Sequence, residues 1–324
     1  MATENVATKY IYLNASELAI AVGANPYQKI KDLIIKLWAR YFPEDYYALL
    51  DEIKETNKVE IIQETEYQCL QRLAEKYIEN KDKVDQVNKK IQECLKSGNT
   101  EDLQEQQKAI LQEIAGTSAD GAGVDEKGKR KMDVADQEQL EKTLVSMTNK
   151  SFGTRKEGDA IAQYEILTKK KVQRISKYFT QEIPTAHLKT PQSLGHISWK
   201  LGGKIDGMTE DGELIEVKNR VSRFFNTVRN YEKVQIQIYF RLLDLETGYL
   251  VESLVKQKGG IPEINIVEVK YEHDYWSDFL MPRIYQFIEF FQHILLDNEF
   301  KMRMLLLEDN KMEREIRQNL FPKK

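Results

Sequence analysis

The sequence predicts an α/β fold with a central mixed sheet flanked by helices and an inserted helical hairpin. Polar and apolar residues alternate through residues 196–221, which is the period of β-strands. Similar runs near 248–255 and 264–271 are preceded and followed by stretches with helical spacing of apolar residues. Residues 44–149 differ, because they are charged, rich in glutamine and almost free of strand signals. We therefore predict one α/β domain interrupted by a helical insertion.

Residues 1–43 and 150–324 are assigned to the α/β domain, and residues 44–149 to the insertion. A chain of 324 residues is long enough to bury one large core of this kind. The N-terminal part starts with a strand-like run, Tyr10 to Leu13, and continues into two helices separated by a Gly-Ala-Asn-Pro-Tyr turn.

Apolar residues in the insertion alternate spacings of three and four from Leu70 to Cys94. This is the pattern of a coiled-coil seam, with Asn80 as one polar position. Residues 98–100 interrupt the helix, and a second helix returns. The segment at about 115–131 is rich in glycine and charge, so we expect it to be mobile. The insertion is either a structural arm or an arm that contacts DNA or a partner.

The composition excludes several classes of protein. No run of 18 apolar residues exists, so no membrane span is expected, and the first residues lack the pattern of a secretory signal. Cys69 and Cys94 are the only cysteines, which indicates a reducing, intracellular compartment. The formal net charge of −4 argues against a uniformly basic nucleic-acid binder. If the protein binds nucleic acid, local patches of charge or metal ions would have to hold it.

The predicted hairpin around residues 204–218 carries the most informative residues. Asp206 is followed by nine residues and then by Glu216 and Lys218, which leave one face of a strand because they are two apart. Two carboxylates beside an ammonium suit a hard divalent cation next to a proton-handling group, the chemistry of metal-assisted phosphodiester cleavage. A Glu-x-Lys pair is also common on exposed strands, so a solvated sheet surface is the alternative.

Five short motifs stand in one order along the chain and together carry a family resemblance. They are Ser16-Glu17 with Lys9 seven positions earlier, Gly23 to Tyr27, Gly153 to Glu157, Asp206 with Glu216 and Lys218, and Gln235 to Gln237. With them the chain resembles the phage lambda-type exonucleases, also called YqaJ-like viral recombinases, which are PD-(D/E)xK nucleases. Ile205 stands where that motif usually has proline. The resemblance stops at the insertion, which is longer than the corresponding stretch of the phage enzyme.

The resemblance implies a restriction-endonuclease-like core with a metal site in the hairpin. Oxygens of Asp206 and Glu216 and the carbonyl oxygen of Val217 would bind Mg²⁺ or Mn²⁺. Glu157, expected at the start of a helix over about 152–168, would add a third carboxylate. The set would then suit two ions that stabilise the attacking and leaving oxygens.

Two further side chains complete the implied catalytic site. Lys218 would orient or deprotonate the attacking water, and Gln235 would hydrogen-bond that water or Lys218. The alternative for Gln235 is a solvated helix residue, in which case Gln237 would take its role.

The same resemblance implies contacts with the DNA backbone. Ser16 and Lys9 would form a pocket for a terminal 5′-phosphate, which Lys204 would also face. The alternative for Ser16 is a plain helix N-cap. Arg220 and Arg223, just beyond the catalytic strand, are predicted to contact backbone phosphates.

The function implied by the resemblance is Mg²⁺-dependent hydrolysis of DNA by a 5′→3′ exonuclease. It would act on linear duplex ends and leave 3′ single strands for recombination or repair. The family also implies a viral source, which would place the protein in the cytoplasm or nucleus of a host cell. It further implies a single-strand annealing protein as partner, while the resemblance leaves open whether the chain forms a homo-oligomer. The alternatives are an endonuclease, a nuclease that prefers single strands, and a catalytically silent DNA-binding or assembly protein. A variant with an iron–sulfur cluster is excluded, because it needs four cysteines.

Overall fold

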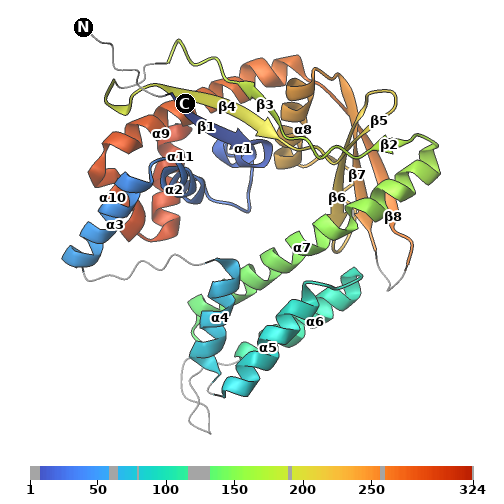
Figure 1. The fold of residues 1–324 in the computed structure, drawn as a ribbon, viewed down its shortest axis with the longest axis horizontal. Helices are drawn as coiled ribbons and strands as arrows, with labels where there is room; N and C mark the ends of the chain where they lie inside the picture. Colours follow the sequence, from blue (N-terminus) through green and yellow to red (C-terminus); the bar gives the residue numbers. More distant parts are fainter. Residues whose placement is uncertain are drawn as a thin grey trace.

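The structure, a computed structural model, describes residues 8–57, 65–78, 80–115, 132–188, 192–255 and 260–322. It contains two mixed sheets flanked by helices, which confirms the predicted α/β class (Figure 1). The strands are β1 (Lys9–Asn14), β2 (Val172–Gln173), β3 (Phe179–Glu182), β4 (Ile197–Gly203), β5 (Gly207–Thr209), β6 (Leu214–Arg220), β7 (Thr247–Leu254) and β8 (Glu263–Lys270).

The helices lie on both sides of the sheets and in a separate arm (Figure 1). They are α1 (Ala15–Ala21), α2 (Ile30–Tyr41), α3 (Pro43–Asn57), α4 (Glu66–Tyr77), α5 (Lys81–Cys94), α6 (Thr100–Ala115), α7 (Val134–Thr168), η1 (Gln192–Leu194), α8 (Asn230–Leu243), η2 (Tyr275–Leu280), α9 (Met281–Leu296), α10 (Asn298–Leu306) and α11 (Asp309–Leu320). No helix within the described ranges, including the long α7, is apolar enough over a sufficient length to cross a membrane.

The order of strands places the predicted hairpin at the centre of the fold. One sheet has the order β1-β4-β3 and the other β2-β5-β6-β7-β8, with β1/β4 and β6/β7 as the parallel pairs. Residues 204–206 link β4 to β5 and so connect the two sheets. Gly212 adopts φ +81° in the turn between β5 and β6, a conformation that suits glycine, as the predicted turn requires. Helix α8 connects the parallel strands β6 and β7.

The main core lies between the three-stranded sheet and the helices around it. Ile284, Phe287, Ile288 and Phe291 of α9 recur three and four residues apart and are fully buried, so this aromatic-rich helix belongs to the core. The Phe291 ring meets Trp199 of β4 edge-on, with centroids 5.6 Å apart.

The boundary of the insertion differs from the predicted one. Tyr46, Leu49, Leu50 and Ile53 of α3 are buried in the main core, so residues 43–57 belong to the α/β domain. The sequence reading was wrong here because the charged surface of α3 outweighs its short apolar stripe. The arm begins after α3 and has a core of its own.

The arm consists of α4, α5, α6 and the first half of α7 rather than a two-helix hairpin. Asn80 accepts hydrogen bonds from the backbone N–H groups of Asp82 and Lys83 and thereby caps α5, so the predicted continuous seam is two helices. Thr100 donates through its backbone N–H and its hydroxyl to the carbonyl of Val255, which fixes the α5–α6 turn at the end of β7. The segment predicted to be mobile lies almost entirely outside the described residues.

Candidate active site

Strand β6 separates the apolar and the charged residues of the hairpin onto its two faces. Ile215 and Val217 pack with Ala160 and other apolar residues of α7. Glu216 and Lys218 leave the opposite face, as their spacing predicts, and the Lys218 Nζ donates to Glu216 Oε1 over 2.7 Å. The Glu216 side chain is 3% exposed and the Lys218 side chain 24%. The strand therefore buries a carboxylate and leaves an ammonium partly open to solvent.

Asp206 lies at the edge of β6, just before β5 begins to pair with it. Its Oδ2 accepts a hydrogen bond of 2.8 Å from the backbone N–H of Val217. The N–H and C=O groups of one strand residue point to the same side of the strand. The Val217 carbonyl therefore faces the same edge as the Asp206 carboxylate, which is the arrangement needed if both are to bind one cation.

Helix α8 brings Gln235 onto the charged face of β6. Lys218 Nζ donates to Gln235 Oε1 over 3.1 Å, and Gln235 Nε2 donates to the hydroxyl of Tyr239 over 2.9 Å. Gln237 is fully buried instead, where it bonds the backbone of Lys270 and Glu272. Of the two glutamines, Gln235 is therefore the one at the site.

Glu157 lies inside α7 rather than at a helix start, because α7 runs without a break through residues 134–168. The predicted start at 152 was wrong, since Gly153 and Gly158 are accommodated within the helix. Burial and the charge of Asp206 raise the pKa of Glu157, which places its carboxylate in the electric field of the site. Across the described ranges, no three His, Cys, Asp or Glu side chains lie close enough together to form a metal-binding group.

The carboxylates of the site are electrostatically unfavourable without a cation. Burial, reinforced by the charge of Asp206, raises the pKa of Glu216 to about 8. Burial also raises the pKa of Asp206. Burial lowers the pKa of Lys218, but the charge and the hydrogen bond of Glu216 raise it by more. The pKa is therefore raised overall, which favours the ammonium form. The site thus concentrates negative charge that Lys218 alone does not neutralise.

The donor atoms present fit a hard divalent cation. Glu216 Oε2 is buried and has no hydrogen-bond partner among the described residues, while Oε1 is occupied by Lys218. A buried carboxylate oxygen without a partner is costly unless a cation binds it. Together with Asp206 and the Val217 carbonyl, it forms the all-oxygen set that Mg²⁺ and Mn²⁺ prefer.

Gly202 and Gly203 admit two tyrosine rings next to the site. A Cβ at Gly202 would lie 2.0 Å from the Tyr178 hydroxyl oxygen, and one at Gly203 would lie 2.5 Å from Cε1 of Tyr239. Glycine in a strand allows close approach of another group, and at Gly202 and Gly203 that group is a tyrosine side chain. Tyr239 in turn positions Gln235 through their hydrogen bond.

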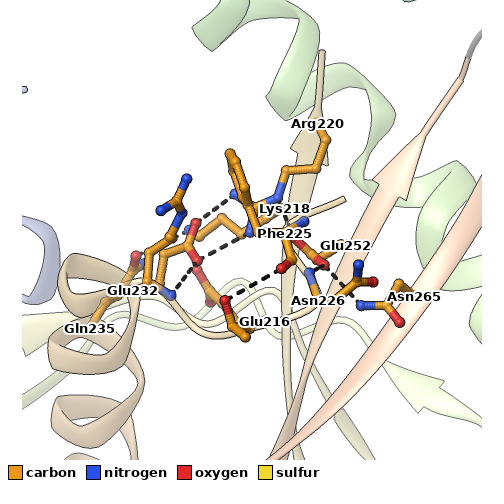
Figure 2. Close-up of polar contacts among 11 residues, drawn as sticks. Glu216, Lys218, Arg220, Phe225, Asn226, Glu232, Gln235, Glu252 and Asn265 are labelled. Carbon is orange, nitrogen blue, oxygen red and sulfur yellow. Dashed lines mark hydrogen bonds and ion pairs between the residues drawn. The ribbon is translucent and has the colours of Figure 1, made fainter. Parts of the chain in front are cut away.

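Arg220 belongs to a buried ion-pair network and not to a DNA-binding surface (Figure 2). Its guanidinium donates to both carboxylate oxygens of Glu232, over 2.6 and 3.1 Å, and through Nε to Glu252 over 2.7 Å. Only 7% of the residue is exposed, and Glu232 and Glu252 are fully buried. The prediction that Arg220 contacts backbone phosphates is therefore wrong, because the continued alternation of β6 turns it inward.

Glu252 uses the same network to hold the loop that follows β6 (Figure 2). It accepts hydrogen bonds from the backbone N–H groups of Phe225 and Asn226 and from the side chain of Asn265. Burial raises the pKa of Glu252, but these hydrogen bonds outweigh it and the pKa is lowered overall. Glu232 also accepts from the N–H of Arg229 at the start of α8. The network thus links β6, β7, the loop and the helix that carries Gln235.

The predicted phosphate-binding residues are not gathered in one place. Lys9 begins β1, whereas Ser16 lies in α1 beyond the other end of this six-residue strand, which spans about 17 Å. Lys9 donates to the carbonyl of Tyr41 and lies over the Phe42 ring, so its predicted pairing with Ser16 is wrong. Ser16 is exposed at the end of β1 that faces the site, and Lys204 and Arg223 are exposed as well.

Arg174 is a cation of the site that the sequence does not reveal. A Cβ at Gly158 would lie 3.3 Å from Nη1 of Arg174, so the glycine that follows Glu157 makes room for the guanidinium. The charge of Arg174 acts on both Glu157 and Asp206. The contact joins α7 to the segment after β2, and no local pattern could have indicated it.

Comparisons with known proteins add limited information. No protein-family model matches the sequence, and no curated protein matches it. Among solved structures, the chain is similar to an alkaline exonuclease, LHK-Exo of Laribacter hongkongensis, with 13% identity and a TM-score of 0.35 over 63% of this chain and 86% of that one. LHK-Exo in complex with dAMP is 15% identical, with a TM-score of 0.30 over 67% of this chain and 86% of that one. SSO0001 is 17% identical, with a TM-score of 0.32 over 48% of this chain and 67% of that one. These likenesses are distant, so the chemistry of the site carries the functional conclusion.

Proposed function

We propose that this protein is a metal-dependent DNA nuclease, and that it acts as a 5′→3′ exonuclease on linear duplex ends. The observation that carries the proposal is the convergence of Glu216, Lys218 and Gln235 on one face of β6, with Asp206 and the Val217 carbonyl at one edge of the same strand. An exposed Glu-x-Lys pair on a solvated sheet would not bury the carboxylate or engage a glutamine from a separate helix. Buried, incompletely paired charge is typical of a functional site.

The residues of the chain divide the work between charge and orientation. When bound at the oxygens of Asp206, Glu216 and Val217, Mg²⁺ or Mn²⁺ would polarise the phosphodiester and activate water. Lys218, held by Glu216 and Gln235, would orient the attacking water and stabilise charge on the phosphate. Gln235 would keep Lys218 aligned, because the Tyr239 hydroxyl holds the side-chain amide of Gln235 in place. Glu157, on whose pKa the charge of Asp206 acts, would be the carboxylate recruited for a second ion.

Preference for a 5′-phosphorylated end is supported by the residues around Ser16. Lys36 and Arg40 of α2 both approach Glu17, the neighbour of Ser16, with Lys36 Nζ at 2.7 Å and an Arg40 nitrogen at 3.7 Å from Oε1. Two half-exposed cations and one carboxylate leave a net positive charge at Glu17, the residue that follows Ser16 in α1. This group takes the place that the sequence reading gave to Lys9.

Digestion of linear duplexes with Mg²⁺ tests the proposal. The substrates are one duplex with a 5′-phosphate, the same duplex with a 5′-hydroxyl, and a closed circle. Lys218→Ala should abolish cleavage, whereas Lys270→Ala on β8 should not, because that side chain is 72% exposed and far along the sheet.

Each outcome has a defined meaning. Cleavage of linear DNA only, with a preference for 5′-phosphate, supports the exonuclease. Cutting of closed circles would instead establish an endonuclease. No cleavage with Mg²⁺ or Mn²⁺, or equal activity in Lys218→Ala, would overturn the nuclease and leave a DNA-binding or assembly protein. A partner that anneals the resulting single strands would be sought only after the first outcome.

A further inference from the structure

A cleft of about 750 Å³ lies outside the catalytic cluster. It is bounded by residues 23–29, which follow α1, by the start of α8, and by α11. Its volume is within the ~300–1,000 Å³ range of sites that bind small molecules. Neither the metal site nor the catalytic roles described above make use of it.

The cleft lies close to the reacting groups along α8. Tyr231 lines it, and Gln235 stands four residues further on the same helix. Residues four apart share a helix face and are separated by about 6 Å along the axis. One helical turn of α8 therefore separates Tyr231 of the cleft from Gln235, the residue that accepts a hydrogen bond from Lys218.

The side chains of the cleft combine aromatic surface with positive charge. Tyr27 is 66% exposed, and its ring meets Tyr231 edge-to-face with centroids 5.7 Å apart. Arg229 lies over the Phe225 ring, 3.8 Å from its centroid, and its buried Nε has no hydrogen-bond partner within the part of the chain that the structure describes. Arg317 donates through Nε to Glu313 over 2.6 Å.

The net charge of the cleft favours an anion. Lys29, Arg229 and Arg317 line it together with a single carboxylate, Glu313. That carboxylate is already engaged, because one oxygen accepts from Arg317 and the other from the backbone N–H of Lys31 over 3.0 Å. An exposed tyrosine ring beside cations is the combination that stacks a base and holds its phosphate.

We propose that this cleft binds a nucleotide of the DNA strand being cut. A base stacks on Tyr27, beside Tyr231, and its phosphate contacts Arg229 and Arg317. The inference deepens the proposed function and rests on it. A released mononucleotide offers the same chemistry as a nucleotide within the strand, so the test must distinguish these two sources.

Binding without catalysis tests the cleft. Wild-type protein and variants are titrated into a fluorescent single-stranded thymidine oligonucleotide in EDTA, and anisotropy is followed at several salt concentrations. The variants are Tyr27→Leu and Arg317→Ala. The matched controls are Tyr47→Leu, an exposed tyrosine on α3, and Arg314→Ala, an exposed arginine on α11 outside the cleft.

Tyr27→Leu should weaken binding about fivefold or more without changing the salt dependence, because it removes stacking. Arg317→Ala should weaken binding and reduce the slope of log K against log salt by about 0.7, because one phosphate contact is lost. Thymidine monophosphate is then added as competitor. Displacement of the oligonucleotide from wild type identifies a mononucleotide site, and no displacement identifies a strand site.

The inference is overturned if Tyr27→Leu and Arg317→Ala bind like their controls. That result leaves the nuclease untouched, since cleavage with Mg²⁺ is measured separately. Conversely, loss of binding in both variants of a protein that does not cleave DNA would keep the cleft and reject the nuclease. Circular dichroism of each variant checks that the exposed substitutions leave the fold intact.

Discussion

Two clusters of buried charge lie side by side on one face of β6 and differ in how completely they are paired. In the Asp206–Glu216–Lys218 cluster, Glu216 Oε2 has no hydrogen-bond partner among the residues described. Burial and the charge of Asp206 raise the pKa of Glu216 to about 8. In the Arg220–Glu232–Glu252 cluster, only two residues along the strand, Arg220 has hydrogen bonds to both carboxylates.

The difference teaches which buried charges to assign to function. A paired network rigidifies the elements that it joins, whereas an unpaired carboxylate costs stability that only a ligand can offset. Sequence alone does not separate the two clusters, because Glu216, Lys218 and Arg220 are charged residues spaced by two on one strand. The following predictions would break or sharpen this distinction, from the largest expected effect to the smallest.

Lys218→Ala should reduce the rate of DNA cleavage about 10³-fold and lower the melting temperature less than Arg220→Ala does. The side chain orients the water and phosphate. Its loss takes the ammonium away from Glu216, but that carboxyl can take up a proton instead, because its pKa is already raised to about 8. Initial rates on end-labelled linear duplex, with a thermal melt of the same preparation, measure both. A loss of fold in this variant would show that the catalytic cluster is structural as well.

Arg220→Ala should destabilise the protein by about 3–5 kcal/mol, because it leaves Glu232 and Glu252 as buried carboxylates without their cation. Urea unfolding measures the loss. Arg223→Ala, three residues further and exposed, is the matched control and should change stability little. Equal stability of the two variants would contradict the assignment of Arg220 to the structural cluster.

The stability of the metal-free protein should depend on pH through Glu216. The pKa of Glu216 is about 8 in the folded protein and has its ordinary value in the unfolded protein. Between about pH 4.5 and 8 the unfolded state has lost a proton that the folded state still binds, so the free energy of unfolding falls as pH rises. The effect is on the order of 3 kcal/mol. In thermal melts, the melting temperature of Glu216→Gln should therefore rise relative to that of wild type between pH 5 and pH 8.

Mg²⁺ completes this test. It should stabilise wild type most at pH 8, where fewer protons must be displaced, and Glu216→Gln much less. A Mg²⁺-induced shift of equal size in both proteins, or one that is independent of pH, would remove Glu216 from the metal site.

Ser16→Ala should reduce the preference for a 5′-phosphorylated end about tenfold, because a hydrogen bond to a charged group is lost. The ratio of cleavage rates on the phosphorylated and hydroxyl duplexes measures the effect. Ser277→Ala, an exposed serine on η2, is the control. An unchanged ratio would mean that Ser16 is only an exposed residue in the first turn of α1, which Asn14 caps.

Local patterns predicted most elements and the catalytic strand. The alternation in β6 requires Glu216 and Lys218 to share a face, since a strand has a period of two. Helical spacing located α2, α8 and α9. The error in α3 arose because its apolar stripe is short, and the error at Asn80 arose because a cap residue imitates a polar seam position.

The sequence by itself determined the α/β class, the hairpin and the pairing of Glu216 with Lys218, because each depends on residues close together in the chain. Only the tertiary structure decided the fate of Arg220, the distance of Lys9 from Ser16 and the place of Arg174. Each of these depends on which strand end or helix lies opposite, and burial then fixes whether a charge is paired or left for a ligand.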